Sequence, residues 1–288
     1  MTAPSISAVI LTLNEELNLS DCLASLEGLC HDIIVVDSGS TDGTLEIAKR
    51  YSARILQHPF ETHAKQWNWA FQNIPFQGNW ILALDADQRV SPGLRDEIAA
   101  VLHSIPADTD GYYLPRKQIF RGRWIRYGGY WPKYLLKLFR NGTGQADERE
   151  LLDFRFYVRG KTALLKNPLI EQNENEQAIL FWLKKHLRFI ELLAQEEYGR
   201  RQNKNGWAIR PSTTGTPDQK VLWRKNLWYR MPLFIRPFLY FGYRYFIQLG
   251  FLDGPQGFLF HFLQGFWFRL MVDVRLAELD KEHARSRD

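Results

Sequence analysis

Short, mainly apolar runs recur along the first third of the chain, separated by segments in which apolar positions have helical spacing. Residues 33–36 and 80–84 are apolar throughout, 6–13 is interrupted only by Ser7 and Thr12, and 54–57 (Arg-Ile-Leu-Gln) is expected to be a further short strand; the helical segments cover 17–29, 44–51 and 64–73. Short apolar runs without alternation are typical of strands buried on both faces. Their alternation with helices predicts an α/β fold with a doubly wound, mainly parallel sheet flanked by helices.

Polar or acidic side chains follow three of these strands. They are Thr12, Asn14 and Glu15 after the first strand, Asp37 after the second, and Asp85-Ala86-Asp87 after the fourth. Right-handed crossovers bring the carboxyl ends of parallel strands to one edge of the sheet, where open α/β sheets bind ligands. We therefore expect these side chains to share one site.

The Asp85-Ala86-Asp87 triplet predicts a metal site. Neighbouring carboxylates raise each other's pKa unless a cation lies between them, and Mg²⁺ or Mn²⁺ prefers carboxylate oxygens together with substrate phosphates. The hypothesis is a metal–diphosphate site. The alternative is that both aspartates only cap the turn before a helix that begins at Ser91-Pro92.

The loop Ser38-Gly39-Ser40-Thr41-Asp42-Gly43 offers a second way to hold phosphate, through backbone N–H groups at a helix start. It lacks the lysine of a P-loop and the Gly-x-Gly-x-x-Gly spacing, so neither of those motifs is present.

Beyond a helix expected over 92–104, residues 111–139 are strand-like and rich in Arg, Lys, Tyr and Trp. This basic, aromatic region is either a surface for a phosphorylated or sugar ligand, or a solvated edge. An acidic cluster, Asp147 to Glu150, precedes a further strand pair at 154–159 and 163–165.

The last part of the chain reads as helical and becomes aromatic. One long helix is expected over 177–204, with His186 on its surface and one apolar face made of Leu180, Leu183, Leu187, Ile190 and Ala194. A polar linker follows at 203–219. From Val221 onward, apolar and aromatic residues flanked by basic ones suit a membrane interface, or else pack on the preceding domain or form a dimer face.

Composition narrows the picture only slightly. The 288 residues permit one large domain or one domain with an appendage, and the net charge of +5 suits a membrane surface, phosphate-bearing ligands or nucleic acid equally. Two cysteines, Cys22 and Cys30, make no disulfide framework, which favours a reducing compartment. Neither a signal peptide nor an apolar span of transmembrane length is indicated.

Four segments taken together resemble a known family. They are Val9 to Glu16, Ile34 to Thr44, Ala64 to Ala70 and Leu82 to Asp87. In this order and spacing they are similar to the family 2 inverting glycosyltransferases of the GT-A fold, especially the bacterial subgroup that builds lipopolysaccharide core and exopolysaccharide. The resemblance covers about the first 170 residues, and Gly250 to Gly254 resembles that subgroup more weakly.

The resemblance implies a role for each matching residue. Thr12, Asn14, Glu15, Asp37, Lys65, Asn68, Asp85 and Ala86 would line the nucleotide and donor pocket, and Asp85 and Asp87 would hold Mn²⁺ or Mg²⁺ on the diphosphate. Glu148 would be the general base that deprotonates the acceptor hydroxyl, with Asp147 as a rival. Relatives often carry a His within the segment matching Leu169 to Gln172, so a third metal ligand here is either Glu171 or nothing.

The resemblance also implies partners and a location. The partners would be a nucleotide-sugar donor, most simply a UDP-sugar, and a lipid-linked or envelope glycan acceptor. The location would be the cytoplasmic face of a bacterial inner membrane. Nucleic acid is not expected as a partner, and the sequence leaves the oligomeric state open. Transfer to polyprenyl phosphate is an alternative, as is a non-catalytic nucleotide-sugar-binding membrane scaffold. The expected organisation is a catalytic GT-A domain at 1–175, a helix and linker at 176–218, and a membrane-interface region at 219–288.

Overall fold

The computed structural model describes residues 5–203 and 206–285, and it separates into two compact units. The first unit comprises Met1–Ile119, Pro132–Glu148 and Phe154–Asn175, and the second comprises Phe120–Trp131, Arg149–Asp153 and Glu176–Asp288. Positions 204 and 205 of the expected linker, and the first four residues, lie outside the described residues.

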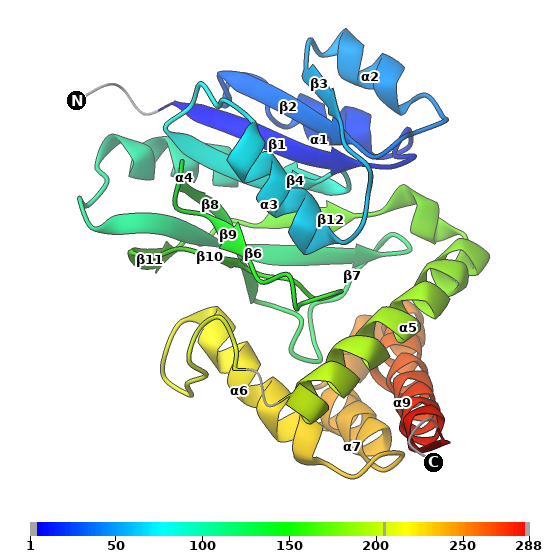
Figure 1. Cartoon of the computed structure of the whole chain (residues 1–288). Coiled ribbons are helices and arrows are strands. Elements are labelled where there is room, and N and C mark those ends of the chain that lie inside the picture. The colour runs from blue at the N-terminus through cyan, green and yellow to red at the C-terminus, as the bar shows by residue number, and fades with distance from the viewer. Residues whose placement is uncertain (1–4, 204–205, 286–288) are drawn as a thin grey trace. The chain divides into compact units, whose positions relative to one another are not determined.

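The first unit is built on one large sheet with the strand order β3-β2-β1-β4-β8-β6-β12-β5 (Figure 1). Its strands are β1 (Ile6–Thr12), β2 (Asp32–Asp37), β3 (Arg54–Gln57), β4 (Trp80–Asp85), β5 (Gln88–Val90), β6 (Thr109–Phe120), β8 (Lys133–Arg140) and β12 (Leu169–Gln172). β11 (Lys161–Leu164) also pairs with β6, whereas the short strand β7 (Arg123–Trp124) belongs to the second unit.

The strand directions confirm a mainly parallel sheet. β1, β2, β3 and β4 are mutually parallel neighbours, and β12 runs parallel to β6. β8 is antiparallel to both β4 and β6, and β5 is antiparallel to β12. The strand that begins at Trp80 therefore has one parallel and one antiparallel neighbour.

Helices cover both faces of this sheet, as the unbroken apolar runs predict. On β1, Ala8 and Ile10 face the cluster that contains α1 (Leu19–Ala24), α2 (Thr44–Arg50) and α4 (Pro92–His103). Val9, between them, faces the opposite cluster with α3 (His63–Asn73). Successive strand side chains point to opposite faces, so an alternating run would have left one face polar.

Two helix starts are set by local sequence. Ser91 accepts a hydrogen bond from Leu94 N at 3.3 Å, and Pro92 occupies the first turn of α4. Thr62 caps α3 in the same way through Lys65 N, also at 3.3 Å. Side-chain oxygens at this position satisfy backbone donors that have no partner within the helix.

One expected strand pair and one expected helix need correction. The segments at 154–159 and 163–165 do not pair with each other: β10 (Phe156–Tyr157) pairs with β9 (Gln145–Ala146), and β11 pairs with β6. The first helix is also shorter than expected, because only Leu19–Ala24 is α-helical and turns follow.

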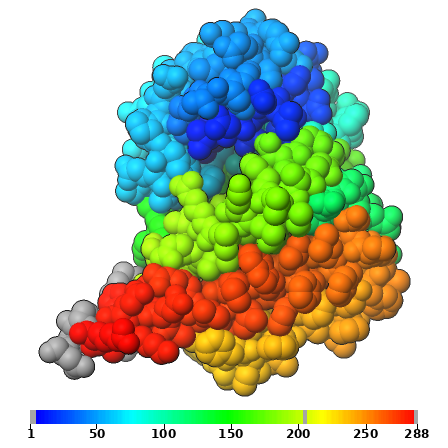
Figure 2. All heavy atoms as spheres, turned by 90° about the vertical axis from the view of Figure 1, so that its right-hand side faces the viewer, coloured from blue at the N-terminus to red at the C-terminus, as the bar shows by residue number. Residues whose placement is uncertain are grey.

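The second unit is helical. Its α-helices are α5 (Ile179–Asn203), α6 (Pro217–Arg230), α7 (Arg236–Gly242), α8 (Gly254–Phe260) and α9 (Phe268–Arg285). Three short helical segments lie between them in the chain: η2 (Tyr243–Ile247), η3 (Gly250–Asp253) and η4 (His261–Trp267). A fourth, η1 (Glu174–Gln177), precedes α5 and begins at the last residues of the first unit. Figure 2 shows α5, in lime green, lying along α9, in orange to red, and the two share a buried cluster that includes Ile190, Ala194 and Leu276.

The expected apolar face of the long helix is wrong in part. Ile190 and Ala194 are buried, but Leu180 and Leu187 are 69% and 58% exposed. The surface position expected for His186 is also wrong, since its ring is buried and stacks on Trp182 with a centroid distance of 3.4 Å. Burial lowers the pKa of His186 to about 4, so this imidazole is neutral at pH 7.

Candidate active site

The carboxyl ends of three strands meet at one edge of the sheet. In the strand register Thr12 lies beside Asp37, and Leu11 lies beside Asp85. Neighbouring strands are about 4.8 Å apart, so the backbones at Asp37 and Asp85 are separated by roughly 10 Å across β1. This is a suitable edge for a ligand that spans two strands.

Asp37 is fully buried and organises the loop that follows β2. One carboxylate oxygen, Oδ2, accepts hydrogen bonds from Gly39 N and Ser40 N, both at 2.9 Å. The other, Oδ1, accepts from the Ser40 hydroxyl at 2.5 Å and from the Thr12 hydroxyl at 3.0 Å. Asp37 and Thr12 therefore give this edge its shape whatever else they contact.

The loops after β1 and β2 are joined by reciprocal hydrogen bonds. Asn14, whose φ of 57° is left-handed, donates its N–H to Ser40 Oγ and accepts from Thr41 N through Oδ1, both at 2.8 Å. Glu15 N donates to Thr44 Oγ1, and Glu16 accepts from Gly43 N, again both at 2.8 Å.

This network excludes the phosphate-cradle reading of the Ser38–Gly43 loop. The N–H groups of Gly39, Ser40, Thr41 and Gly43, all among the described residues, donate to side-chain oxygens of the protein itself. A phosphate would have to displace carboxylate or amide acceptors that already satisfy these donors.

The first aspartate of the triplet, Asp85, lies at the end of β4 and holds a buried lysine. Its Oδ2 is 2.9 Å from Nζ of Lys137, and the side chains of Asp85 and Lys137 are 35% and 5% exposed. The same ammonium lies 5.8 Å from the ring centroid of Trp67 and 5.5 Å from that of Phe156. Lys137 thus supplies a resident positive charge beside Asp85, while Ala86 is buried next to it.

Asp87 belongs to a polar chain that reaches the loop after β1. Asn173 donates to Asp87 Oδ2 at 3.1 Å, and Asn18 donates to Asn173 Oδ1 at 3.3 Å. Asn18, which is fully buried, also donates to Glu15 Oε2 at 2.7 Å. Glu15 and Asp87 are therefore brought into one network by two asparagines.

Sequence reasoning missed Lys137, Asn18 and Asn173. Each has its partner far along the chain, 52 positions away for Lys137 and Asp85 and 155 positions away for Asn18 and Asn173. The sequence contains a weak signal for Lys137: it lies between Leu136 and Leu138 on an expected strand, and a lysine buried there needs a counter-ion.

Glu171, the possible third metal ligand, is held by other groups. Arg116 Nη1 donates to its Oε1 and Gln88 Nε2 to its Oε2, both at 2.9 Å. Gln88 in turn accepts from Asp85 N at 3.1 Å, so Glu171 supports the turn that presents the aspartates.

The donor set fits a divalent cation that arrives with its own phosphate ligands. No group of three or more His, Cys, Asp or Glu side chains that could hold a metal occurs within the part of the chain that the structure describes. Mg²⁺ is usually bound by one or two carboxylates together with waters and substrate phosphates. Asp85 and Asp87 can supply the carboxylates of such a set.

The two carboxylates considered for the general base differ in environment. Glu148 is exposed, and Asn68 Nδ2 donates to its Oε1 at 2.9 Å. Asn68 also binds Ala146 N and O, at 2.9 and 3.0 Å, which fastens this segment to α3. Asp147 is buried.

Lys65, on the first turn of α3, lies near enough to Glu148 to feel its charge. A hydrogen bond from Lys65 to Glu61 is the main cause of its raised pKa, and the charge of Glu148 adds to the effect. Lys65 and Asn68 thus lie on one helix that also positions Glu148.

The chain belongs to glycosyl transferase family 2, whose family model matches residues 7–166. It is 32% identical over 152 residues to the lipopolysaccharide core biosynthesis glycosyltransferase LpsC of Rhizobium meliloti (strain 1021), covering 49% of this chain and 53% of LpsC. It is 34% identical over 99 residues to the uncharacterized glycosyltransferase RT0209 of Rickettsia typhi (strain ATCC VR-144 / Wilmington), covering 34% of this chain and 33% of that protein. The chain therefore spans about half the length of LpsC and a third of RT0209.

Solved structures show weaker likeness. Glucosyl-3-phosphoglycerate synthase from Mycobacterium tuberculosis, in complex with Mn²⁺, UDP and glucosyl-3-phosphoglycerate, has a TM-score of 0.32 and 24% identity over 41% of this chain and 45% of that one. S. aureus TarS has a TM-score of 0.42 and 15% identity over 76% of this chain and 47% of that one. Scores this low do not bear on the site, so the assignment rests on the family match.

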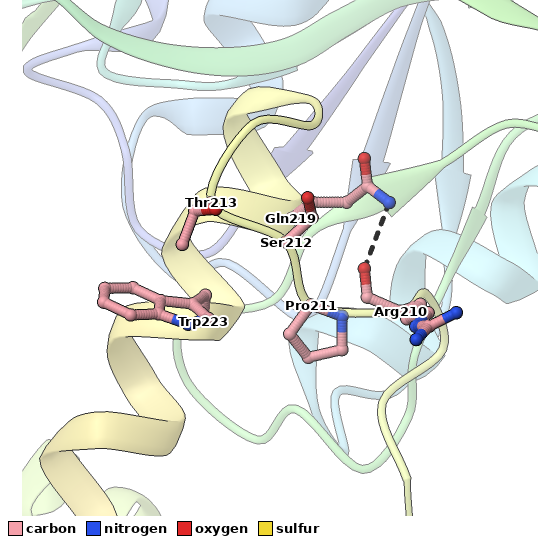
Figure 3. Close-up of a pocket in the computed structure, with 6 residues that line it drawn as sticks. All are labelled: Arg210, Pro211, Ser212, Thr213, Gln219 and Trp223. Carbon is pink, nitrogen blue, oxygen red and sulfur yellow. Dashed lines mark hydrogen bonds between the residues drawn. The ribbon is translucent and has the colours of Figure 1, made fainter.

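A surface depression in the second unit is a separate feature. It has a volume of about 450 Å³ and is lined by Arg210, Pro211, Ser212, Thr213, Gln219 and Trp223 (Figure 3). Gln219 Nε2 donates to Arg210 O at 3.0 Å, which closes the loop before α6. No carboxylate, His or Cys lines it, so it has no group suited to acid–base or metal chemistry.

Proposed function

We propose that this protein is a metal-dependent inverting glycosyltransferase that moves a sugar from a nucleotide-sugar donor to a lipid-linked or envelope glycan acceptor. A UDP-sugar is the first donor to test. The observation that carries the proposal is the Asp85-Ala86-Asp87 triplet at the end of β4, on the same sheet edge as Thr12 and Asp37. Family membership and the named function of LpsC support it.

In this proposal the strand-edge residues bind the donor. Asp85 and Asp87 would hold Mn²⁺ or Mg²⁺, which stabilises negative charge on the departing diphosphate when bound. Asn14, Glu15 and Asp37 would shape the nucleotide end, because their hydrogen bonds fix the loops after β1 and β2.

The acceptor is activated by a carboxylate. Glu148 is the better candidate because it is exposed and is oriented by Asn68, whereas Asp147 is buried. A carboxylate in this role takes the proton of the acceptor hydroxyl, whose oxygen attacks the anomeric carbon in line with the departing diphosphate. A single displacement of this kind inverts the anomeric centre.

Donor binding is tested by thermal shift with a set of nucleotide sugars, each with Mn²⁺ and with chelator. The correct donor raises Tm by mass action, and this rise is lost with chelator and in an Asp85→Asn, Asp87→Asn variant. A rise that survives in both would refute the metal role.

The general base is tested by comparing Glu148→Gln with Asp147→Asn in a transfer assay. Glu148→Gln is expected to abolish transfer while nucleotide binding remains. If Asp147→Asn does so instead, the base is Asp147. If donor binds and no acceptor is glycosylated by the unchanged protein, the transferase proposal fails in favour of a binding role.

Association with the inner-membrane surface, on its cytoplasmic side, is part of this proposal. Twelve large apolar side chains between 234 and 262 are at least 37% exposed: Phe234, Ile235, Phe238, Leu239, Tyr243, Phe246, Ile247, Leu249, Phe251, Leu252, Phe258 and Phe262. Contacts between rings join members of this set, for example Phe258 and Phe262 at 5.9 Å. None of the described helices is long and apolar enough to cross a membrane.

Charge favours an anionic lipid surface as the occupant of this apolar face. Residues 219–272 contain seven Arg or Lys and a single carboxylate, Asp253, which is buried; of the seven, Arg224 and Arg230 are exposed, whereas Arg236 is buried and paired with Asp273. Basic and aromatic side chains around an apolar face suit the headgroup boundary of an anionic bilayer.

Flotation with vesicles of phosphatidylglycerol and phosphatidylcholine tests this assignment. A Phe246→Ser, Ile247→Ser variant is expected to bind at least tenfold more weakly, because these side chains are 59% and 72% exposed and their removal costs little folding energy. The matched control is Leu180→Ser, Leu187→Ser on α5. Equal vesicle binding by both variants and the unchanged protein would refute the membrane assignment.

A further inference from the structure

The segment Gly111–Ala146 is unusually one-sided in charge. It contains eight Arg or Lys residues and no Asp or Glu. Three of the eight pair with acids elsewhere in the first unit: Arg116 with Glu171, Lys137 with Asp85, and Arg140 with Asp110. The charges carried by its central part, residues 121–131, require a separate explanation.

Residues 121–131, here called the 121–131 hairpin, belong to the second unit, and their backbone is firmly held there. Asp253 accepts hydrogen bonds from Arg126 N at 3.1 Å and from Tyr127 N at 3.0 Å. Gly128 donates to Gln248 O at 2.9 Å and accepts from Arg244 Nε at 2.6 Å. The hairpin is therefore a rigid platform, and its side chains are presented at low entropic cost.

Two arginines on this platform point their charge toward solvent. Arg123 and Arg126 are both exposed, and no ion pair with a carboxylate is formed by either within the described residues. The guanidinium of Arg126 lies 5.3 Å from the ring centroid of Trp124 and 5.8 Å from that of Tyr127. Cation–π contacts of this kind restrain the guanidinium, whose planar fork is suited to bidentate binding of an anion.

Aromatic faces surround these charges. Trp124 packs edge-on against Trp131 with ring centroids 5.4 Å apart, and Trp124, Tyr127 and Trp131 are each only partly buried. Partly exposed rings beside guanidinium groups that form no ion pair with a described carboxylate suit a ligand that combines apolar sugar faces with negative charge.

We propose that the 121–131 hairpin is a binding platform for an anionic saccharide. Arg123 and Arg126 bind phosphate or carboxylate groups of that saccharide, while Trp124, Tyr127 and Trp131 contact its rings. The choice of an envelope saccharide as the ligand rests on the proposed function, but binding at the hairpin does not depend on catalysis. A neutral saccharide would offer the two guanidinium groups no anion to bind.

Binding is measured with the full chain, without nucleotide or metal, by calorimetry. The probe is a lipid-free, phosphorylated core oligosaccharide prepared by deacylating bacterial lipopolysaccharide, together with the same oligosaccharide after removal of its phosphates. The variant is Arg123→Gln, Arg126→Gln. The matched control is Arg224→Gln, Arg230→Gln, which removes two exposed arginines from α6 of the same unit.

The unchanged protein and the control are expected to bind the phosphorylated probe at least about tenfold more tightly than the dephosphorylated one. The hairpin variant is expected to lose that preference and to bind both forms with the weaker affinity. Equal affinity of the unchanged protein for the two probes, or a hairpin variant that binds as the control does, overturns the inference.

A second arm separates the saccharide from a lipid headgroup as the source of the anion. Vesicle binding by the hairpin variant is expected to match that of the unchanged protein. Loss of vesicle binding with intact oligosaccharide affinity would make the hairpin a headgroup site and overturn the inference. Failure of the transferase proposal is read separately, as absence of donor-dependent transfer, and leaves the calorimetric result standing.

Discussion

The ion pair between Lys137 and Asp85 allows a direct test of how the candidate metal site is built. Replacing Lys137 with Met keeps a long apolar stem and removes the ammonium that lies 2.9 Å from Asp85 Oδ2. Lys137 is almost completely buried, so water cannot reach its position and solvate Asp85 in place of the lost ammonium. We expect the variant to be less stable, and to be rescued by a divalent cation.

The expected magnitude follows from the exposure of the two partners. Removing one member of a fully buried pair costs about 3–5 kcal/mol, whereas a fully exposed pair is worth about 0–1 kcal/mol. Because the Asp85 side chain is 35% exposed, we expect an intermediate loss. A loss of about 2 kcal/mol lowers Tm by about 4–8 °C in a domain of this size.

The assay is thermal unfolding of Lys137→Met with and without Mn²⁺. The control is Lys133→Met, which removes an exposed lysine from the same strand and is expected to change stability by less than about 0.5 kcal/mol. At about 100 times its Kd, a cation that binds only the folded protein adds about 2.7 kcal/mol. The Mn²⁺-induced rise in Tm should be at least as large in Lys137→Met as in the unchanged protein.

Two results would refute this reasoning. If Lys137→Met and Lys133→Met have the same Tm, the buried pair does not stabilise the fold. If Mn²⁺ stabilises the unchanged protein but not Lys137→Met, the lysine supports cation binding instead of substituting for the cation's charge.

Three further predictions concern groups that the structure places in unusual surroundings. Because burial lowers the pKa of His186 to about 4, the folded state binds fewer protons than the unfolded state between pH 6.5 and pH 4, so stability should fall as the pH falls through this window. The variant His186→Gln should show a weaker dependence of Tm on pH between pH 7 and pH 4.5. A dependence equal to that of the unchanged protein would contradict this prediction. Asp37→Ala should lower the free energy of unfolding in urea by about 3 kcal/mol, because four donors lose their acceptor, and Asp37→Asn should cost clearly less, since one acceptor oxygen remains; equal losses would argue against the hydrogen-bond account. Gly128→Ala should destabilise much more than Gly142→Ala, because both positions have positive φ but a Cβ at Gly128 would lie 2.1 Å from His261 Cε1 whereas open space surrounds Gly142; comparable Tm values for the two variants would show that the ring moves aside.

The apolar strand runs made the core of the first unit predictable. The apolar run at 33–36 lies within β2 (Asp32–Asp37), the run at 80–84 lies within β4, and the short segment expected as a strand at 54–57 is β3 (Arg54–Gln57). Parallel pairing of these strands then requires their carboxyl ends to lie at one edge, so the neighbourhood of Thr12, Asp37 and Asp85 followed from the same pattern. These inferences succeed because a few consecutive apolar residues are enough to indicate a strand that is buried on both faces.

The exposure of single side chains on the helices was less predictable. Helical spacing correctly indicated one long helix, but Leu180 and Leu187 point to solvent while His186 packs on Trp182. Periodicity shows that a helix has an apolar face, yet the partner that packs against the helix selects which residues are buried. Here that partner includes α9, about 80 positions further along the chain.

The sequence alone therefore determined the family, the α/β class and the strand ends at which acidic side chains gather, because these depend on short runs of residues. Only the tertiary structure decided how that edge is filled: a buried Lys137 beside Asp85, the two asparagines that join Glu15 to Asp87, and the donors that occupy Asp37. Polar partners of this kind are fixed by contacts between distant parts of the chain, and burial is what makes each of those contacts obligatory.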